Sequence, residues 1–314
     1  MRHPLHRLLW PLVLGITVCP HNLLFGQSAP AASESSNLTY HSSVSEVRLV
    51  FFATDEHRHA IAGLKPDDFA VIDNETVIRN FRSFAPSDLV KLDVVVLIDS
   101  SESVLPDFQQ EIADVMQLIS QCPWGPGDNV SAVLFGGAGA NLICAGNCRS
   151  SFTADRIASL PRGGPTPLFD AVESAVNLLS QRRQPDVWPV IILFSDGADT
   201  ISKTSFREAL EKVLAGEVQI YAVDVNSSGW PSSGTATLQR IADDSGGRVL
   251  PIAGGAASIF TGVINDLHSA SVITYVPPES SSDFHPVRIL PTHNLKLQFR
   301  SRRGYYHHQA GGAP

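Results

Sequence analysis

Two aspartates that end apolar runs are the residues of this sequence best placed for metal chemistry. Residues 92–98 form a short run of mostly β-branched apolar residues, with one acid, Asp93, near its start, and the run ends at Asp99. A second, wholly apolar run at 190–194 is followed by Ser195 and Asp196. Runs that are apolar on both faces are typical of central strands in a parallel sheet, because helices cover both faces. Ligands bind at the carboxyl ends of strands in open α/β sheets. We therefore expect Asp99 and Asp196 to lie together at one sheet edge.

Hydroxyl side chains accompany both carboxylates. Ser101 and Ser103 follow Asp99 in an Asp-x-Ser-x-Ser pattern, and Thr166 lies in a Gly-Gly-Pro-Thr-Pro turn between the two apolar runs. Carboxylate and hydroxyl oxygens are hard ligands that suit the octahedral coordination of Mg²⁺. Two carboxylates roughly neutralise the ion, and one coordination position is left for water or an incoming carboxylate. The sequence therefore predicts an open metal site made of Asp99, Ser101, Ser103, Thr166 and Asp196.

Each of these residues also has a purely structural explanation. Ser103 and Thr166 are of the types that cap helices, with Pro167 in the favoured first helical position. An aspartate that follows a strand is a common turn residue. Because two aspartates end two buried strands in the right order, the residues taken jointly favour metal binding.

The pattern Asp99-x-Ser101-x-Ser103, Thr166 and Asp196 resembles the metal-ion-dependent adhesion site of von Willebrand factor type A domains. This resemblance implies a doubly wound sheet and a bound Mg²⁺ or Mn²⁺. It also implies that a carboxylate of a partner protein completes the coordination of the ion, and hence a binding function of the adhesion type.

Other polar residues receive lesser roles. We expect Asp199, near the same edge, to support the ligands without contacting the ion, and Asp224 to be structural. His57 and His59 lie in a polar turn, where exposure to solvent is favoured over metal binding.

The segments that must position the site alternate between strands and helices. Strands are expected at 92–98, 130–135, 190–194, 218–225 and 248–252, and helices at 107–119, 152–160, 168–179, 206–214, 237–244 and 259–268. This alternation is typical of βαβ units and a parallel sheet. We therefore predict an α/β fold with a doubly wound, mostly parallel sheet that has helices on both faces.

Segments rich in β structure flank this central domain. Strands are expected at 44–52, 69–72 and 77–84 before it, and at 272–276, 287–290 and 295–300 after it. A β module of about 40 residues is too small to be stable alone. We therefore expect the segments from both ends to pair into one accessory β layer beside the central domain.

The order of these parts resembles secreted bacterial von Willebrand factor A-related proteins. The matching pieces are Gly63-Leu64 with Asp68-Phe69, Ser195-Asp196-Gly197-Ala198-Asp199, Ile241-Ala242 with Gly246-Gly247, and Arg303-Gly304-Tyr305. The predicted boundaries are 1–27 for a signal peptide, 28–43 for a linker, 44–88 for the N-terminal β module, 90–270 for the A domain, 271–306 for the C-terminal β segment and 307–314 for a tail.

The first 27 residues have the pattern of a secretory signal peptide. Arg2 and Arg7 precede an apolar core at 8–18 that is too short for a comfortable membrane span, and small and polar residues follow. The sequence thus predicts a protein that is exported to the periplasm or the outside of the cell and does not span the membrane. The formal net charge of −8 disfavours nucleic acid as a partner.

Three cysteines follow the predicted signal peptide. Cys144-Ala-Gly-Asn-Cys148 is typical of a small disulfide-closed turn in an exported protein. Metal binding by these thiols is the alternative, but only two are close together and no histidine lies between them. Cys122 would then be the unpaired cysteine, near a helix end.

Three functions are compatible with these features. A metal-dependent module that captures a partner carboxylate is favoured, and a secreted assembly scaffold with a merely structural ion is the alternative. A hydrolase that activates water with the metal is disfavoured. No histidine lies near either aspartate-ended loop, and the chain has no Gly-x-Ser-x-Gly, His-Glu-x-x-His or P-loop motif. We therefore expect the protein not to be an enzyme.

Overall fold

The computed structural model divides the chain into two compact units, Met1–Ser43 and Val44–Pro314. It describes residues 46–61, 63–87, 90–106, 112, 115, 119, 124–137, 139–146, 148, 159, 162–226, 230, 232–251, 262–263, 265–279 and 282–306, all of the second unit. The predicted signal peptide, linker and tail, most of the helix expected at 152–160, and Cys122 lie outside these residues. No helix in the described part of the chain is both long enough and apolar enough to cross a membrane.

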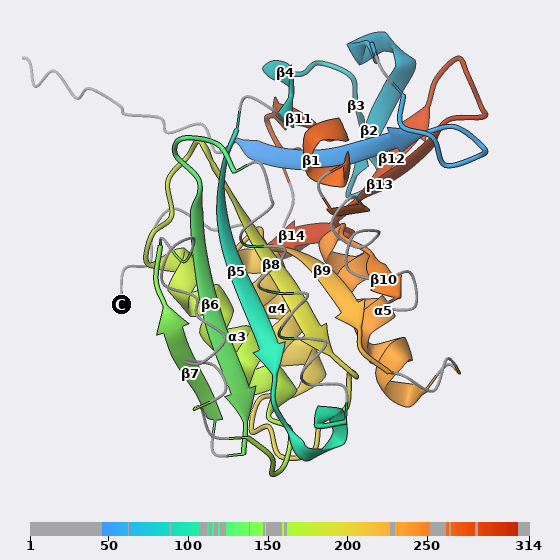
Figure 1. The fold of residues 1–314 in the computed structure, drawn as a ribbon. Coiled ribbons are helices and arrows are strands. Elements are labelled where there is room, and N and C mark those ends of the chain that lie inside the picture. Colours follow the sequence, from blue (N-terminus) through green and yellow to red (C-terminus); the bar gives the residue numbers. More distant parts are fainter. Residues whose placement is uncertain are drawn as a thin grey trace, which may run out of the picture. The chain divides into compact units, whose positions relative to one another are not determined.

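A six-stranded sheet with the order β10-β9-β8-β5-β6-β7 forms the centre of the second unit (Figure 1). Its strands are β5 (Lys91–Asp99), β6 (Asn129–Gly136), β7 (Gly139–Cys144), β8 (Val187–Ser195), β9 (Gln219–Asp224) and β10 (Val249–Pro251). Every neighbouring pair is parallel except β6 and β7, which are antiparallel. The predicted, mostly parallel sheet is confirmed, whereas β7 was not expected as a strand.

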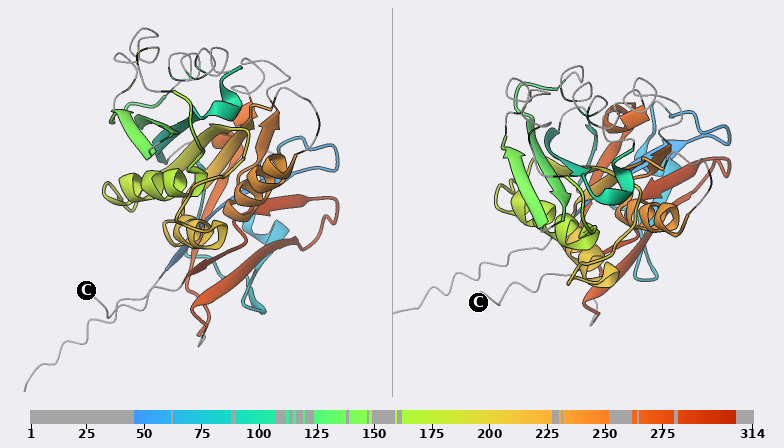
Figure 2. Two further views of the ribbon diagram at one scale, coloured as in Figure 1. Left: turned by 90° about the horizontal axis from the view of Figure 1, so that it is seen from below. Right: turned by 60° about the horizontal axis from the view of Figure 1, so that its bottom comes forward.

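Helices cover both faces of this sheet, as predicted. Helices α3 (Leu168–Ser180), α4 (Phe206–Ala215) and α5 (Ser233–Ser245) pack on one face of the sheet (Figure 2). Helical residues at 112, 115, 119, 263 and 267 pack on the other. Helix α5 begins four residues before the expected start because the Ser232 hydroxyl caps it, accepting a hydrogen bond from Thr235 N at 3.0 Å.

The flanking segments form two four-stranded sheets rather than the single layer that was expected. The first has the order β13-β1-β11-β4 and the second β14-β12-β2-β3, and all their pairs are antiparallel. The strands are β1 (Val47–Thr54), β2 (Phe69–Asp73), β3 (Thr76–Ile78), β4 (Ser83–Pro86), β11 (Ser271–Tyr275), β12 (Phe284–Pro291), β13 (Gln298–Ser301) and β14 (Gly304–Tyr306). Both sheets mix strands from before and after the central domain, so the predicted pairing of the two ends is correct.

The two accessory sheets share an apolar core, which explains why the flanking segments form two layers and not the single layer that was predicted. Phe51 of β1 and Phe69 of β2 belong to different sheets, and their ring centroids lie 4.9 Å apart. The strand expected at 77–84 is in fact two strands, β3 and β4, one in each sheet. The intervening residues 79–82 carry the chain from one sheet to the other.

Candidate metal centre

Three loops meet at the carboxyl edge of the central sheet. The first follows β5, the second precedes α3, and the third follows β8, which pairs directly with β5. Gly163 N donates a hydrogen bond to Ser100 O at 2.7 Å, which joins the second loop to the first. Thr200 N donates to Thr166 O at 2.9 Å, which joins the third loop to the second. Backbone hydrogen bonds therefore hold the three loops together.

Four of the five predicted ligands lie in these loops, the fifth, Asp99, is the last residue of β5, and the five differ in exposure. Asp99 and Ser101 are fully buried, and Thr166 is 2% exposed. Asp196 is partly buried, whereas Ser103 is exposed to solvent. The candidate ligand oxygens therefore range from the buried Asp99, at the bottom of the site, to the exposed Ser103, which a partner molecule can reach.

The carboxylate of Asp99 is held from both sides. Ser101 N donates a hydrogen bond to Oδ1 at 2.9 Å, and Ser195 Oγ donates to Oδ2 at 2.7 Å. Ser195 Oγ in turn accepts from Gly197 N at 3.0 Å. Ser195 was not among the predicted site residues, although its place directly before Asp196 was an available signal. It orients Asp99 and is not itself a predicted ligand.

The environment of Asp99 disfavours its negative charge. Burial raises the pKa of Asp99 to about 6, although hydrogen bonds from Ser101 and Ser195 favour the ionised form. The nearby charge of Asp196 raises this pKa further. A cation placed between the two acids would offset both effects, because an opposite charge favours the ionised carboxylate.

The hydroxyl groups are arranged beside these acids. Ser101 Oγ and Ser103 Oγ lie 3.1 Å apart. Thr166 N donates to Thr200 Oγ1 at 2.7 Å, so the backbone of Thr166 is tied to the third loop. In the described part of the chain, no hydrogen bond engages the Thr166 hydroxyl. This oxygen is therefore free to act as a ligand.

Asp199 and Asp224 bind the starts of helices. Asp199 accepts hydrogen bonds from Ser202 Oγ and, at 3.4 Å, from Phe169 N near the start of α3. Asp224 accepts from Thr235 Oγ1 at 2.7 Å, which ties β9 to α5. The support that Asp199 would give to an ion stays a prediction.

The third loop packs directly against the start of α5. Gly197 adopts a φ of 78°, a conformation that favours glycine. A Cβ atom added to Gly234 would lie 2.2 Å from Asp196 O. The approach of these two backbones fixes the loop that carries Asp196, and no sequence motif marked Gly234.

Replacing Gly234 by alanine is therefore expected to destabilise the protein by about 2 kcal/mol, because overpacking forces the backbone to move. Urea denaturation of the variant measures this loss. Ser233→Ala, at an exposed position next to it, is the control and should change stability by less than about 0.5 kcal/mol. A Gly234→Ala variant as stable as this control would contradict the close packing.

The histidines do not contribute to a metal cluster among the described residues. His57 and His59 are exposed, and His59 Nδ1 lies 3.2 Å from Asp55 Oδ2. No group of three or more histidine, cysteine, aspartate or glutamate residues that could hold a metal occurs in the described ranges. The predicted site has two carboxylates and three hydroxyls, so it is not a group of this kind.

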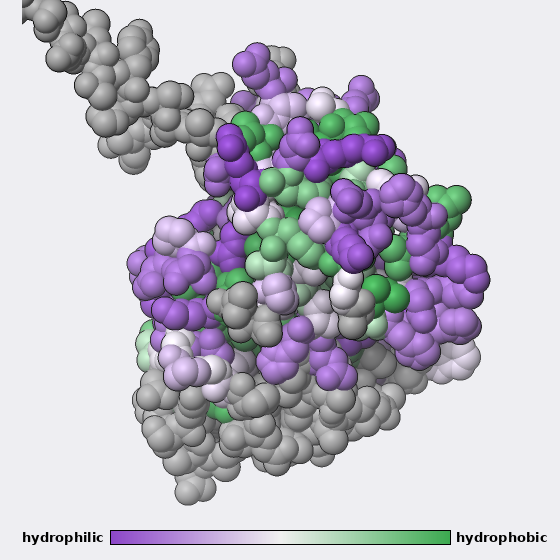
Figure 3. Space-filling view, turned by 90° about the horizontal axis from the view of Figure 1, so that it is seen from above, coloured by the Kyte–Doolittle hydropathy of each residue, from purple (hydrophilic) through white to green (hydrophobic). Residues whose placement is uncertain are grey.

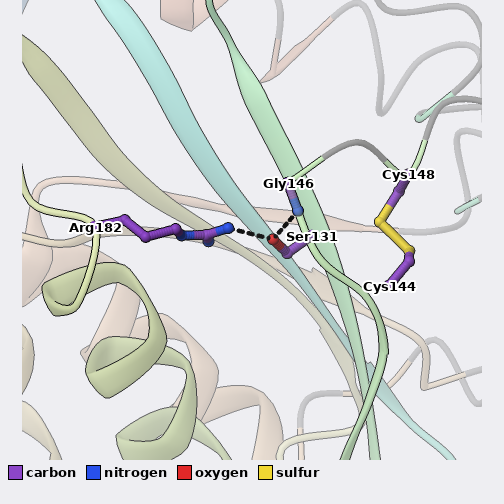
Figure 4. The surroundings of a disulfide bond; sticks show 5 residues. All are labelled: Ser131, Cys144, Gly146, Cys148 and Arg182. Carbon is purple, nitrogen blue, oxygen red and sulfur yellow. Dashed lines mark hydrogen bonds between the residues drawn. A yellow bond between two sulfur atoms is a disulfide. The ribbon is translucent and has the colours of Figure 1, made fainter. Parts of the chain in front are cut away.

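Cys144 and Cys148 form a disulfide bond, with Cα atoms 5.7 Å apart (Figure 4). Gly146 N, inside the closed turn, donates to Ser131 Oγ at 3.0 Å, and Arg182 donates to the same hydroxyl at 3.0 Å. Cys148 N donates a hydrogen bond to Val130 O at 3.1 Å, near the start of β6. The disulfide therefore lies at the opposite end of the sheet from Asp99.

Comparison with known proteins identifies the central part of the chain. The model of the von Willebrand factor type A domain matches residues 93–253, just over half of the chain. The magnesium-chelatase 60 kDa subunit of Rhodobacter capsulatus is 28% identical over 150 residues, which cover 47% of this chain and 26% of that protein. The chain thus spans about a quarter of the length of this curated relative.

Solved structures give weaker matches. Proximal thread matrix protein 1 from the mussel byssus is 19% identical with a TM-score of 0.44, over 56% of this chain and 48% of that chain. An aerotolerance-related membrane protein from Bacteroides fragilis is 18% identical with a TM-score of 0.44, over 56% of this chain and 98% of that chain. Another structure of the mussel protein, described with a zinc-occupied MIDAS motif, is 17% identical with a TM-score of 0.44, over 62% and 50%.

The match to the magnesium-chelatase subunit contradicts the prediction that the protein is not an enzyme. That prediction depended on the lack of a histidine near Asp99 and Asp196 and on the lack of known catalytic motifs. A subunit can serve an enzyme without carrying the reacting groups itself, so motifs within one chain do not decide this question.

Proposed function

Because the chain belongs to the von Willebrand factor type A domain family, we propose that it is a divalent-metal-dependent module that binds a partner protein. Asp99, Ser101, Ser103, Thr166 and Asp196 would hold Mg²⁺ or Mn²⁺. The observation that carries this proposal is the meeting of two carboxylates and three hydroxyls in three hydrogen-bonded loops. Such oxygen ligands suit Mg²⁺ and Mn²⁺, whereas Ca²⁺ usually takes more carboxylates.

When bound, the ion would supply a positive charge to which a carboxylate of the partner protein binds. The residues of the chain would orient the ligands and leave the site accessible to the partner. Ser195 and the backbone of Ser101 keep Asp99 oriented, and the exposure of Ser103 leaves the rim of the site open to the partner. A charge-assisted contact in a partly desolvated site can dominate a small interface.

The charges of the chain support a metal-dependent interaction. Asp99 and Asp196 lie at the same edge of a protein whose formal net charge is −8. An acidic partner group is repelled by these carboxylates when no cation is bound, since like charges disfavour each other. Binding of the partner should therefore require the ion.

The same proposal includes export to the periplasm or the outside of the cell. The pattern of Arg2, Arg7 and the apolar core at 8–18 supports this location. The bond between Cys144 and Cys148 is consistent with an oxidising compartment, where disulfides persist.

Thermal melting in EDTA, Mg²⁺, Mn²⁺ or Ca²⁺ tests the metal site. A free ion at a hundredfold excess over its Kd should stabilise the wild type by about 2.7 kcal/mol. Asp196→Asn should lose most of this response, because it removes one of the two charges that hold the ion. Asp186→Asn is the matched control, since Asp186 is exposed and precedes β8 at the opposite end of the sheet.

Two results would overturn the proposal. The first is a wild-type melting temperature that no divalent ion at millimolar concentration changes. The second is an equal response of the wild type and Asp196→Asn. If the site is present, a partner peptide with a glutamate should bind in Mg²⁺ and be released by EDTA.

A further inference from the structure

The accessory sheets contain a hollow that is separate from the metal centre. Its volume is about 360 Å³, and it lies where the chain crosses from β3 to β4. The lining residues are Val77, Ile78, Arg79, Asn80, Phe81, Arg82 and Val276. Figure 3, which views the molecule from the side of the accessory sheets, shows exposed apolar side chains between strongly hydrophilic ones.

The outer strand β3 contributes Val77 and Ile78 to the lining of this hollow, and β4 begins directly after the lining residue Arg82. β3 is the last strand of one accessory sheet and β4 is the last strand of the other. Among the described residues, neither pairs with a further strand on its outer side. β4 ends in Pro86, a residue that protects sheet edges, whereas β3 has no proline or lysine at Thr76–Ile78. The edge of β3 is therefore open to pairing with another extended segment.

The side chains at the hollow are apolar and positively charged. Val77 is 54% exposed and Val276 is 38% exposed. Arg79 and Arg82 are also exposed, and within the described ranges neither forms an ion pair. The hollow has no acidic lining residue, in a protein with a net charge of −8.

These two arginines differ from most of the other arginines that the structure describes. Ion pairs with acidic side chains are formed by Arg182, Arg183, Arg207, Arg240, Arg248, Arg300, Arg302 and Arg303. Arg79 and Arg82 thus provide a local positive charge that the described part of the protein does not neutralise. Acidic groups of another molecule would complement it.

We propose that this hollow binds an extended, acidic segment of a partner protein, which adds a strand to the free edge of β3. Side chains of a strand alternate between two faces, so one face of the segment would pack apolar groups on Val77 and Val276. Carboxylates of the segment would lie against Arg79 and Arg82. Backbone pairing gives such an interaction its affinity, and the alternate side chains give it specificity.

Fluorescence anisotropy with labelled probes tests this site in the full chain, in EDTA so that the metal centre does not contribute. The probes are an octapeptide of alternating valine and glutamate, the corresponding valine–lysine peptide, an octaglutamate and an octathymidylate. The valine–glutamate peptide should bind most tightly. The double variant Arg79→Glu/Arg82→Glu should weaken its binding at least about tenfold, because both favourable charges become repulsive.

Two further variants separate edge docking from simple charge attraction. Arg207→Glu/Arg240→Glu makes the same charge change at exposed positions on α4 and α5 of the central domain, and it should alter binding less than about twofold. Val77→Ser removes the apolar contact without adding charge, and it should weaken binding of the valine–glutamate peptide but not of octaglutamate. Circular dichroism establishes that each variant is folded.

Four results would overturn the proposal: no binding of the valine–glutamate peptide at millimolar concentration, equal binding of the valine–lysine peptide or octathymidylate, equal binding of octaglutamate, or unchanged affinity in Arg79→Glu/Arg82→Glu. Octathymidylate binding would instead identify a nucleic-acid surface.

Discussion

The metal-free protein with Asp99→Asn is expected to be more stable than the wild type at neutral pH. Burial raises the pKa of Asp99 to about 6 from an ordinary value of 3.8, so folding at neutral pH must bury an unfavourable charge. This difference corresponds to at most about 3 kcal/mol. Asparagine keeps an acceptor for Ser101 N but lacks one of the two carboxylate oxygens. Because this loss reduces the benefit of removing the charge, we expect a net gain in stability of about 1–3 kcal/mol.

The pH dependence of this gain has a definite sign. The folded state binds a proton at Asp99 more tightly than the unfolded state, because its pKa is raised. The contribution of Asp99 to stability is therefore most favourable below pH 3.8, and it is lost as pH rises through about 6. Urea denaturation of both proteins in EDTA should show a difference that is largest above pH 7 and shrinks towards pH 4.

Adding Mg²⁺ or Mn²⁺ should reverse the order, since only the wild type has the carboxylate to hold the ion. Asp170 is the control. Burial raises the pKa of this carboxyl, but hydrogen bonds from Thr204 N and Lys203 N outweigh burial and hold the pKa below its ordinary value. Asp170→Asn should therefore destabilise the metal-free protein, because the folded state favours the charged form of Asp170. If Asp99→Asn also destabilises the metal-free protein, Asp99 is a structural residue.

Asp73→Ala is expected to destabilise the protein by about 3–5 kcal/mol, because it leaves a buried polar network without its acceptor. Asp73 is fully buried, and its Oδ1 lies 2.8 Å from His285 Nδ1. Its Oδ2 accepts hydrogen bonds from the hydroxyls of Tyr275 and Tyr305 at 2.9 and 2.8 Å. The four residues come from β2, β12, β11 and β14 and thus connect the two accessory sheets.

Urea denaturation measures this loss of stability, and variants of single residues show how much each hydrogen bond of the network contributes. Tyr305→Phe removes one hydrogen-bonding hydroxyl and should cost about 1 kcal/mol. Tyr306→Phe, the neighbouring position outside the network, should be close to neutral. A loss below 1 kcal/mol for Asp73→Ala would show that the network does not hold the sheets together.

The central sheet and the positions of the candidate ligands could be predicted because they depend on local patterns. Apart from Asp93 near its start, the run at 92–98 is apolar on both faces, and the structure places it in the buried strand β5, Lys91–Asp99. An acid that directly follows such a strand lies at the carboxyl edge of the sheet whatever the rest of the chain does. Asp99 and Asp196 follow neighbouring strands, so they lie at the same edge.

The contacts that orient the site were less accessible. Ser195 binds Asp99 across 96 positions of sequence, and Gly234 touches the loop of Asp196 through backbone atoms. The place of Ser195 directly before Asp196 marks it as a candidate residue, but nothing in the sequence shows that it binds Asp99, and no pattern marks the contact of Gly234. Both contacts form only when β5, β8 and α5 pack together in the folded protein.

The sequence by itself therefore determined the strand type, the strand ends and the oxygen-rich loops that follow them. Tertiary structure alone decided that 77–84 becomes two strands and that Asp73 meets His285, 212 positions away. The physical reason is that alternation along a strand reports which face is buried but not which strand will be its neighbour. That choice is made by burial of side chains such as Phe51 and Phe69, which come together between two sheets only when distant parts of the chain meet.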